Sequence, residues 1–188
     1  MAGREEPRMR RWAEAGRDFG PKVEIHPDAF VHDTALIHGR VRIGANVSIW
    51  LHVVIRAEDR EVVVGEGSNL QDFVMVHVGS GAPTIIGRNC SITHHVTVHG
   101  AEIGDDVLVG INATVMDGAR IGAGSIVAGH AIVSERAAFP ERSIVAGVPA
   151  KLIRERDSSE ANRANADWYL RNARAYARGV HRVSGWEG

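Results

Sequence analysis

The stretch IGDDVLVGINATVMDGARIGAGSIVAGHAIV, residues 103–133, places an aliphatic residue at every sixth position from Ile103 to Val133. This spacing matches neither the α-helical repeat of about 3.6 residues nor the alternation of a simple strand. It is typical of a triangular coil in which each flat side is one short strand and three hexapeptides complete a turn of about 18 residues. The aliphatic side chain points inward, and the small residue four places later, such as Ala113 or Ala119, lets the chain turn.

The same spacing extends through most of the chain before residue 103. It recurs in three runs: Ile25, Val31, Ile37, Ile43, Ile49 and Ile55; Val64, Leu70 and Val76; Ile86, Ile92 and Val98. Glycine often follows the aliphatic residue, as at Gly104 and Gly122, where a tight corner tolerates little side chain. The spacing of the inward residues widens between Ile55 and Val64 and between Val76 and Ile86, which predicts loops of about three and four residues at these two places. Loops on a rigid scaffold are favoured places for function. The sequence predicts an all-β fold, a left-handed parallel β-helix, with its coil over residues 21–155.

The two ends of the chain have a different character. Residues 1–20 mix Arg and Glu without a clear period, which predicts a flexible N-terminal arm. In residues 156–188, Asp157-Ser158-Ser159-Glu160 resembles a helix capping box. An apolar stripe follows it, formed by Ala161, Ala164, Trp168, Ala175 and Tyr176. We expect a C-terminal helix that packs back along the coil.

Composition excludes several classes of partner. The chain has 188 residues, enough for one domain, and 22 Lys and Arg against 23 Asp and Glu leave a net charge of −1. Such a balance provides no cationic field for nucleic acid or an anionic membrane. The charged start and the lack of an apolar run of about 20 residues predict a soluble, cytoplasmic protein. The single cysteine, Cys90, cannot form an internal disulfide and is expected to be a small buried residue.

The hexapeptide register brings particular histidines together. Arg56, His77 and His99 each follow the inward aliphatic residue of the same side on successive turns. Equivalent positions stack about 4.8 Å apart, so two imidazoles there could direct nitrogens at one metal ion. His94 falls on the preceding side, above Asp72, and a neighbouring chain around a threefold axis could bring it to the pair. Three histidines and an open position are typical of catalytic zinc, although the spacing is equally compatible with ordinary surface or interface histidines.

Five segments of the sequence carry recognisable motifs: Asn69–Asp72, Val76–Val78, His94–Gly100, Val109–Ala119 and Gly147–Lys151. Together they resemble the gamma-class carbonic anhydrases and their hexapeptide-repeat relatives. The similarity runs through most of residues 21–155, although the last segment is common to many hexapeptide acyltransferases.

The resemblance implies a homotrimer with Zn²⁺, or Fe²⁺ or Co²⁺, bound between chains by His77 and His99 of one subunit and His94 of its neighbour. It implies a lyase that hydrates CO2 to bicarbonate through a metal-bound hydroxide. It also implies that Gln71 holds the hydroxide or the substrate, and that Arg56 and Asp72 pair across the interface.

Three departures from the family pattern concern proton transfer. Relatives commonly have Arg-Gly-Asp where this chain has Arg56-Ala57-Glu58, so the acid is longer by one methylene. The loop at 78–83 lacks the acidic shuttle of highly active members, which leaves Glu58, Asp59 or His95 to export the proton. His95 stands where relatives usually have glycine, in register with Phe73 and Asn112. The sequence does not fix the register of the C-terminal helix, so it does not predict whether Tyr169 or Tyr176 approaches the site.

Three other functions are compatible with the sequence. The first is a metal-dependent acyl-CoA thioesterase or hydrolase of the phenylacetate- and carnitine-associated branch, which a roomy pocket near Phe73, His95 and Asn112 would favour. The second is an acyltransferase, which needs a histidine base and no metal triad. The third is a catalytically weak trimeric scaffold whose metal is structural or absent.

Overall fold

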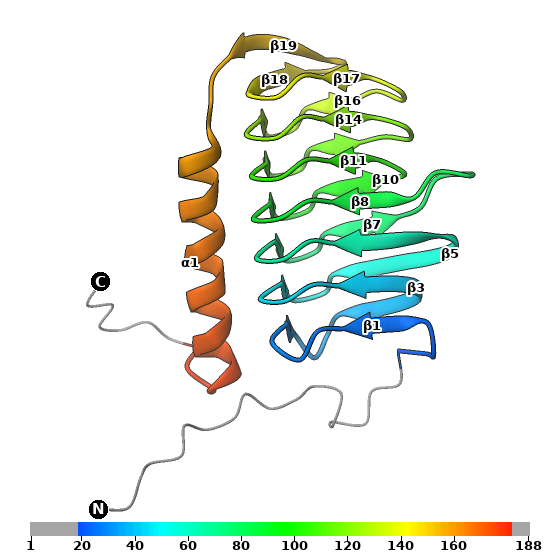
Figure 1. Cartoon of the computed structure of the whole chain (residues 1–188), viewed down its shortest axis with the longest axis vertical. Coiled ribbons are helices and arrows are strands. Elements are labelled where there is room, and N and C mark those ends of the chain that lie inside the picture. Colours follow the sequence, from blue (N-terminus) through cyan, green and yellow to red (C-terminus); the bar gives the residue numbers. More distant parts are fainter. Residues whose placement is uncertain (1–18, 182–188) are drawn as a thin grey trace, which may run out of the picture.

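The computed structural model describes residues 19–181 and confirms the predicted left-handed parallel β-helix. The chain winds through about seven turns of parallel strands, and one α-helix stands beside the coil (Figure 1). Residues 1–18 of the predicted N-terminal arm lie outside the described part of the chain.

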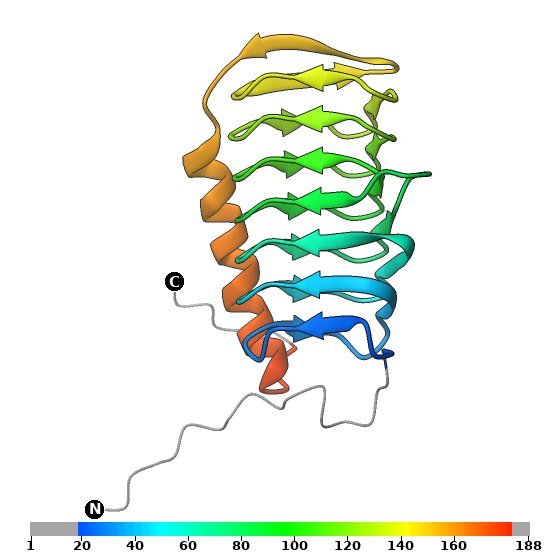
Figure 2. The same ribbon diagram turned by 45° about the vertical axis from the view of Figure 1, so that its right-hand side comes forward.

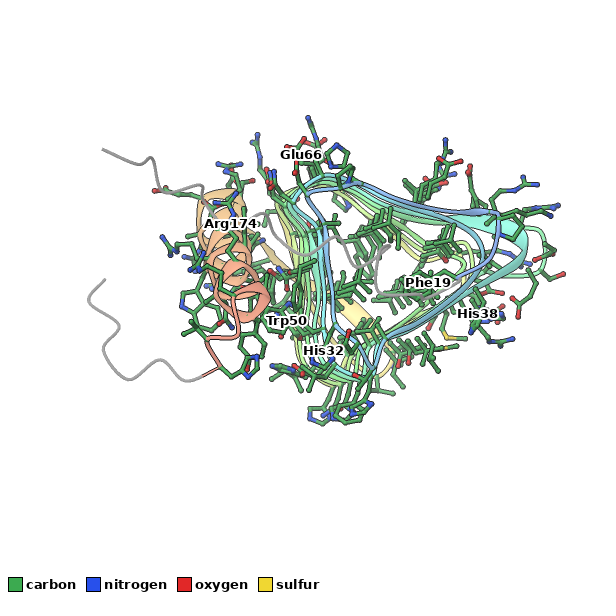
Figure 3. All side chains as sticks on the ribbon, turned by 90° about the horizontal axis from the view of Figure 1, so that it is seen from below. Phe19, His32, His38, Trp50, Glu66 and Arg174 are labelled. Atoms are coloured by element: carbon green, nitrogen blue, oxygen red, sulfur yellow. The ribbon has the colours of Figure 1, made fainter. Side chains whose placement is uncertain are left out.

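The strands form the three sides of a triangular prism, seen end-on in Figure 3. The first side, which faces the helix, carries eight strands: β2 (Phe30–Val31), β4 (Ser48–Ile49), β6 (Asn69–Leu70), β9 (Ser91–Ile92), β12 (Leu108–Val109), β15 (Ile126–Val127), β18 (Ser143–Gly147) and β19 (Ala150–Glu155). All its pairs are parallel except β18 with β19, which closes the end of the coil.

An eleven-stranded sheet wraps the second and third sides, because β3 (Leu36–Ile43) and β5 (Val54–Val64) run through the corner between them. The second side continues with β7 (Met75–His77), β10 (Thr97–His99), β13 (Thr114–Val115) and β16 (Ile132–Val133). The third side comprises β1 (Val23–Ile25), β8 (Thr84–Ile86), β11 (Glu102–Ile103), β14 (Arg120–Ile121) and β17 (Ala138–Phe139).

The predicted inward residues stack in register inside the prism. On the second side Ile55 pairs with Val76, Val76 with Val98, and Val98 with Val115, and all four are fully buried. The small residues four places later also point inward, since Ala113 is fully buried. The residue before most of them makes the turn with a positive φ, as Asn112 does with a φ of 59°. The small residue is therefore required by limited space in the core, and the turn itself is made one residue earlier.

The glycines that follow the aliphatic residues lie where successive turns of the coil approach most closely. A Cβ on Gly122 would lie 2.3 Å from the backbone nitrogen of Glu141, and one on Gly104 would lie 2.7 Å from that of Ala123. Both are far below ordinary contact distance, so these positions exclude a side chain.

The two predicted loops have different outcomes. Residues 78–83 leave the coil as a short hairpin with a bridge between Gly79 and Ala82, and it projects beyond the corner in Figures 1 and 2. The loop predicted at 55–64 is wrong, because β5 continues through the corner as one strand of 11 residues. Its neighbour β3 pairs with it on both sides of a bulge between Gly39 and Val41, so the extra residues widen the corner without leaving the sheet.

Helix α1 (Ser159–Ala177) runs back along the first side, as predicted (Figures 1 and 2). The predicted apolar stripe is only partly correct. Ala161 and Ala164 are exposed while Asn162, Ala166 and Ala173 are buried, but the stripe member Tyr176 does pack against Trp50. Further along the helix, predicted stripe member Trp168 is exposed as well. The shape of the coil surface selects the buried face, because small side chains are needed where the helix lies close to the strands.

Aromatic rings fill the wider space near the end of the helix. Trp50 lies between coil and helix (Figure 3), with ring centroids 5.7 Å from Tyr169, 5.0 Å from Tyr176 and 5.4 Å from Phe30. The two contacts with the tyrosines are edge-on, which is a usual stabilising geometry for aromatic pairs, and the Phe30 ring is tilted. These contacts anchor α1 to the first turns of the coil.

The predicted capping box is also wrong. Ser158 is the N-cap but makes no side-chain capping bond, and its buried hydroxyl has no partner. The carboxylate of Asp157 instead accepts hydrogen bonds from the backbone nitrogen (3.0 Å) and hydroxyl (2.7 Å) of Ser159. The first free amide of the helix is thus capped by Asp157, the residue that precedes the N-cap Ser158.

Two further expectations concern the chain as a whole. Cys90 is fully buried, as expected, and desolvation raises the pKa of its thiol to about 12. Within residues 19–181, no helix is long and apolar enough to cross a membrane.

Candidate metal and catalytic site

The residues expected at the site lie at the two corners that bound the second side. Strand pairing places Arg56, His77 and His99 in one column, as predicted, with His38 directly before Arg56 in the same column. His38 lies away from the helix in Figure 3, so this column occupies the corner between the second and third sides. We call it the histidine-pair corner. His94 and Asp72 occupy the other corner, between the first and second sides, which we call the His94 corner.

The two histidines of the first corner face each other. His77 Nδ1 lies 2.9 Å from His99 Nε2, and the ring centroids are 4.8 Å apart. Each side chain is about a quarter exposed, at 21% for His77 and 31% for His99. The pair is therefore partly desolvated but open on one side.

A carboxylate holds the outer nitrogen of each ring. His77 Nε2 lies 2.9 Å from Glu58 Oε2, and His99 Nδ1 contacts Asp117 Oδ1. Each carboxylate favours the ring proton on the nitrogen that faces it, so His77 Nδ1 and His99 Nε2 would both present lone pairs to a cation placed between them.

Asp117 is the residue that the sequence interpretation missed. Its carboxylate fills the space beside Gly79 and Gly100, where added Cβ atoms would lie 2.8 Å from Asp117 Cγ and 2.9 Å from Asp117 Oδ1. Extending the register from Val98 and Val115 places Asp117 beside Gly100, so the signal was present. The prediction considered only histidine partners and overlooked the acidic residue one turn further along.

Glu58 connects the histidine pair to Arg56. Its other oxygen, Oε1, accepts a hydrogen bond from Arg56 Nη1. Desolvation raises the pKa of Glu58, but the hydrogen bond with His77 and the charge of Arg56 outweigh it, and the net pKa lies below the usual value. Glu58 is therefore an ionised acceptor at neutral pH. Within the single chain Arg56 pairs with Glu58, and the expected pairing of Arg56 with Asp72 of a neighbour stays a prediction.

The His94 corner contains a second group of expected residues. His94 Nδ1 lies 3.0 Å from Asp72 Oδ2, and the two side chains are 38% and 29% exposed. Gln71 precedes Asp72 and is buried, and its Nε2 donates to Asn69 Oδ1 at 3.0 Å. One nitrogen of His94 is thus held by a carboxylate, as in the histidine pair, in a side chain that is partly open to solvent.

His95 and Asn112 follow on the same corner. The ring of His95 stacks parallel on Phe73, with centroids 4.9 Å apart and planes 2° from parallel. Phe73 is 52% exposed, so these rings form an open stack and not the lining of an enclosed pocket within one chain. Asn112 Nδ2 lies 3.4 Å from His130 Nε2, one turn further.

The helix also approaches this corner. Desolvation raises the pKa of Tyr169, and the charge of Asp72 adds to the shift. Tyr169 therefore lies within electrostatic reach of Asp72, while its ring is engaged with Trp50.

The donors fit a divalent metal ion, but one chain supplies only part of the ligand set. Across residues 19–181 of a single chain, no three His, Cys, Asp or Glu side chains gather closely enough to hold a metal. The histidine pair offers two imidazole nitrogens with carboxylates behind them, which is the common arrangement around metal-binding histidines. His94 has the same chemistry on the neighbouring corner.

Comparisons with known proteins identify the family. The chain is 51% identical over 122 residues to a protein of Methanocaldococcus jannaschii described as "Probable carbonic anhydrase", covering 65% of this chain and 77% of that protein. It is 37% identical over 106 residues to the mitochondrial gamma carbonic anhydrase 2 of Arabidopsis thaliana, covering 53% of this chain and 38% of the plant protein. It is also 36% identical over 152 residues to the carnitine operon protein CaiE of Escherichia coli K12, covering 81% and 75%.

A solved structure and a family profile also match the chain. The hexapeptide transferase family protein of Anaplasma phagocytophilum superposes with a TM-score of 0.78 at 32% identity, covering 82% of this chain and 92% of that one. The family profile "Bacterial transferase hexapeptide (six repeats)" matches residues 100–135. The chain belongs to the gamma carbonic anhydrase-like family of hexapeptide-repeat proteins.

Proposed function

We propose that this protein is a metal-dependent lyase that hydrates CO2 to bicarbonate. The observation that carries the proposal is the histidine pair, whose facing nitrogens His77 Nδ1 and His99 Nε2 lie 2.9 Å apart while Glu58 and Asp117 contact the outer nitrogens. Zn²⁺ is the proposed ion, with Fe²⁺ or Co²⁺ as alternatives. When bound, such an ion lowers the pKa of a coordinated water molecule toward about 7 and supplies a nucleophile near neutral pH.

We further propose that the active unit is a homotrimer in which the histidine-pair corner of one chain meets the His94 corner of the next. The two corners bound the same side of the prism, so a threefold arrangement can bring unlike corners together at each of three interfaces. The outward residues Leu36 and Ile132 of that side are 54% and 39% exposed, which supports its burial against a neighbour.

The chain's own residues have distinct roles in this proposal. Arg56 supplies positive charge and keeps Glu58 ionised, and Glu58 orients His77. Gln71 and Asp72 would reach the site from the neighbouring chain together with His94, with Gln71 holding the substrate through its amide. Proton export falls to Glu58, Asp59 or His95, because the 78–83 hairpin carries no acidic residue. Asn112 would border the mouth beside His95.

An acyl-thioester hydrolase is the second candidate. The exposed ring of Phe73, stacked with His95 next to His94, offers a flat apolar surface for an acyl chain. The same metal chemistry would act on a thioester carbonyl. The open form of this stack gives no enclosed acyl pocket in one chain, so CO2 remains the first candidate.

Stopped-flow CO2 hydration by protein loaded anaerobically with Fe²⁺ or Zn²⁺ tests the reaction. We expect a rate well above that of buffer, loss of that rate in His94→Ala, and an unchanged rate in His26→Ala, an exposed histidine outside both corners. About one bound metal per chain without CO2 hydration would refute the anhydrase proposal. Activity on acyl-CoA would then support the second candidate, and a protein that binds no metal would indicate an acyltransferase or scaffold.

Subunit mixing tests the interfacial site separately. His77→Ala and His94→Ala each destroy every site in a homotrimer. In a mixed trimer, one of the three interfaces joins an intact histidine pair to an intact His94. Random assembly of equal amounts therefore restores about a quarter of the wild-type sites. No recovery of metal binding or activity in verified mixed trimers would refute a site shared between chains.

A further inference from the structure

A line of side-chain hydrogen bonds, partly buried at the helix and buried in the coil, connects helix α1 to Gln71. Ser91 Oγ donates to Asn165 Oδ1 of the helix at 2.8 Å, and Asn69 Nδ2 donates to Ser91 Oγ at 3.0 Å. Gln71 Nε2 then donates to Asn69 Oδ1 at 3.0 Å. At its helix end this line joins Ser91 and Asn165, which are 74 positions apart in the sequence.

The coil holds these side chains in a fixed and dry environment. Asn69 of β6 and Ser91 of β9 are paired residues on adjacent turns, and the exposed fractions of Asn69, Ser91 and Gln71 are between 0 and 2%. Asn69 Nδ2 also reaches the carbonyl of Cys90 at 3.3 Å. Hydrogen bonds in such surroundings are strong, and a buried polar group that loses its partner is costly.

The helix end of the line sets the direction of every bond. A carbonyl oxygen such as Asn165 Oδ1 accepts only, so the Ser91 hydroxyl must donate to it. The Ser91 oxygen is then left to accept from the Asn69 amide, and this turns Asn69 Oδ1 toward Gln71. The Gln71 amide consequently directs its nitrogen at Asn69 and its oxygen the other way.

We propose that Asn165 is a positioning residue that fixes the orientation of the Gln71 amide through Ser91 and Asn69. The C-terminal helix thereby takes part in preparing the site, beyond covering one side of the coil. The catalytic consequence rests on the proposed function, in which Gln71 holds the substrate. The physical coupling of Asn165 to Gln71 does not depend on that assignment.

The sequence allows a direct readout, because Gln71 is the only glutamine in the chain. Protein labelled with glutamine carrying ¹⁵N in the side-chain amide therefore gives NMR signals from a single NH2 group. We expect these signals to be shifted from those of the unfolded protein and protected from solvent exchange. Asn165→Ala should move them toward the unfolded position and speed exchange, while Asn165→Asp, which keeps the acceptor, should restore positions close to wild type.

Asn162→Ala is the matched control on the same helix. Asn162 is also buried and donates from its amide to the carbonyls of Asp106 (2.8 Å) and Ser125 (3.0 Å), but no bond leads from it to Gln71. Its loss should lower the melting temperature and leave the Gln71 signals in place. Ser91→Ala interrupts the line in the coil itself, so it provides the same test if Asn165→Ala fails to fold.

CO2 hydration separates the two proposals. If the wild-type protein is active, Asn165→Ala should lose about fivefold in kcat/KM, the equivalent of one ordinary hydrogen bond. Gln71 signals that stay unchanged in both folded Asn165→Ala and Ser91→Ala would overturn the positioning role. An inactive wild type whose Gln71 signals respond as expected would refute the anhydrase function and leave the coupling supported.

Discussion

Removal of the Asp117 carboxylate should weaken metal binding without disturbing the fold. Asp117 contacts His99 Nδ1 and occupies the space beside Gly79 and Gly100. Without it, the proton of His99 is free to move to Nε2, the nitrogen that faces His77. A fraction of the molecules would then present an N–H where the proposed metal needs a lone pair.

The size of the effect follows from burial and from the role of the carboxylate. Loss of the hydrogen-bond partner of a metal-binding histidine typically costs about 10- to 100-fold in metal affinity. His99 and Asp117 are 31% and 35% exposed, so water can replace part of the interaction. We therefore expect about tenfold for Asp117→Asn, which keeps an acceptor oxygen, and up to about 100-fold for Asp117→Ala.

Competition with a chromophoric chelator measures the metal affinity directly. Asp105→Ala is the control, since Asp105 pairs with Arg88 and not with a histidine. His99→Ala shows the effect of losing the ligand itself, and circular dichroism of the metal-free proteins checks the fold. An affinity of Asp117→Ala within about twofold of wild type, while His99→Ala loses the metal, would refute the proposed role of this carboxylate.

Two further predictions concern the coil. Gly122→Ala should lower the free energy of unfolding by about 1–3 kcal/mol in a denaturant titration, because its Cβ would lie 2.3 Å from the backbone nitrogen of Glu141. Gly129→Ala is the control, since the nearest atom to its Cβ would lie at 3.1 Å, and it should lower the free energy of unfolding by less. Equal losses of stability in the two variants would contradict the proposed close approach at Gly122. Desolvation raises the pKa of Asp105, but its hydrogen bonds with Arg88 outweigh this and hold the pKa below the usual value. Its stabilising effect, about 0.5 kcal/mol for a largely exposed pair, is therefore present at neutral pH and lost progressively as the pH falls below about 4 and through the lowered pKa of the folded state. A stability gap between wild type and Asp105→Asn that does not shrink as the pH falls from neutral into this range would contradict this.

The site and the fold differ in how much of them could be predicted from the sequence. The six-residue repeat was sufficient to predict the coil, because each turn repeats the last and a residue's neighbour one turn away is set by counting. The same counting predicted the column of Arg56, His77 and His99 and the position of His94 above Asp72. Register alone could not decide that Glu58 is close enough to contact His77, because that depends on how β5 widens its corner.

Contacts between different kinds of element were decided by the tertiary structure. The predicted stripe on α1 was wrong at Ala161, Ala164 and Trp168 because the face a helix buries depends on the shape of the surface that receives it, here the coil around Trp50. For the same reason no pattern in the sequence connects Asn165 with Ser91, which meet only after the chain has turned back along the coil. Periodic contacts within the coil are encoded by local spacing, whereas contacts between helix and coil depend on packing across segments that share no period.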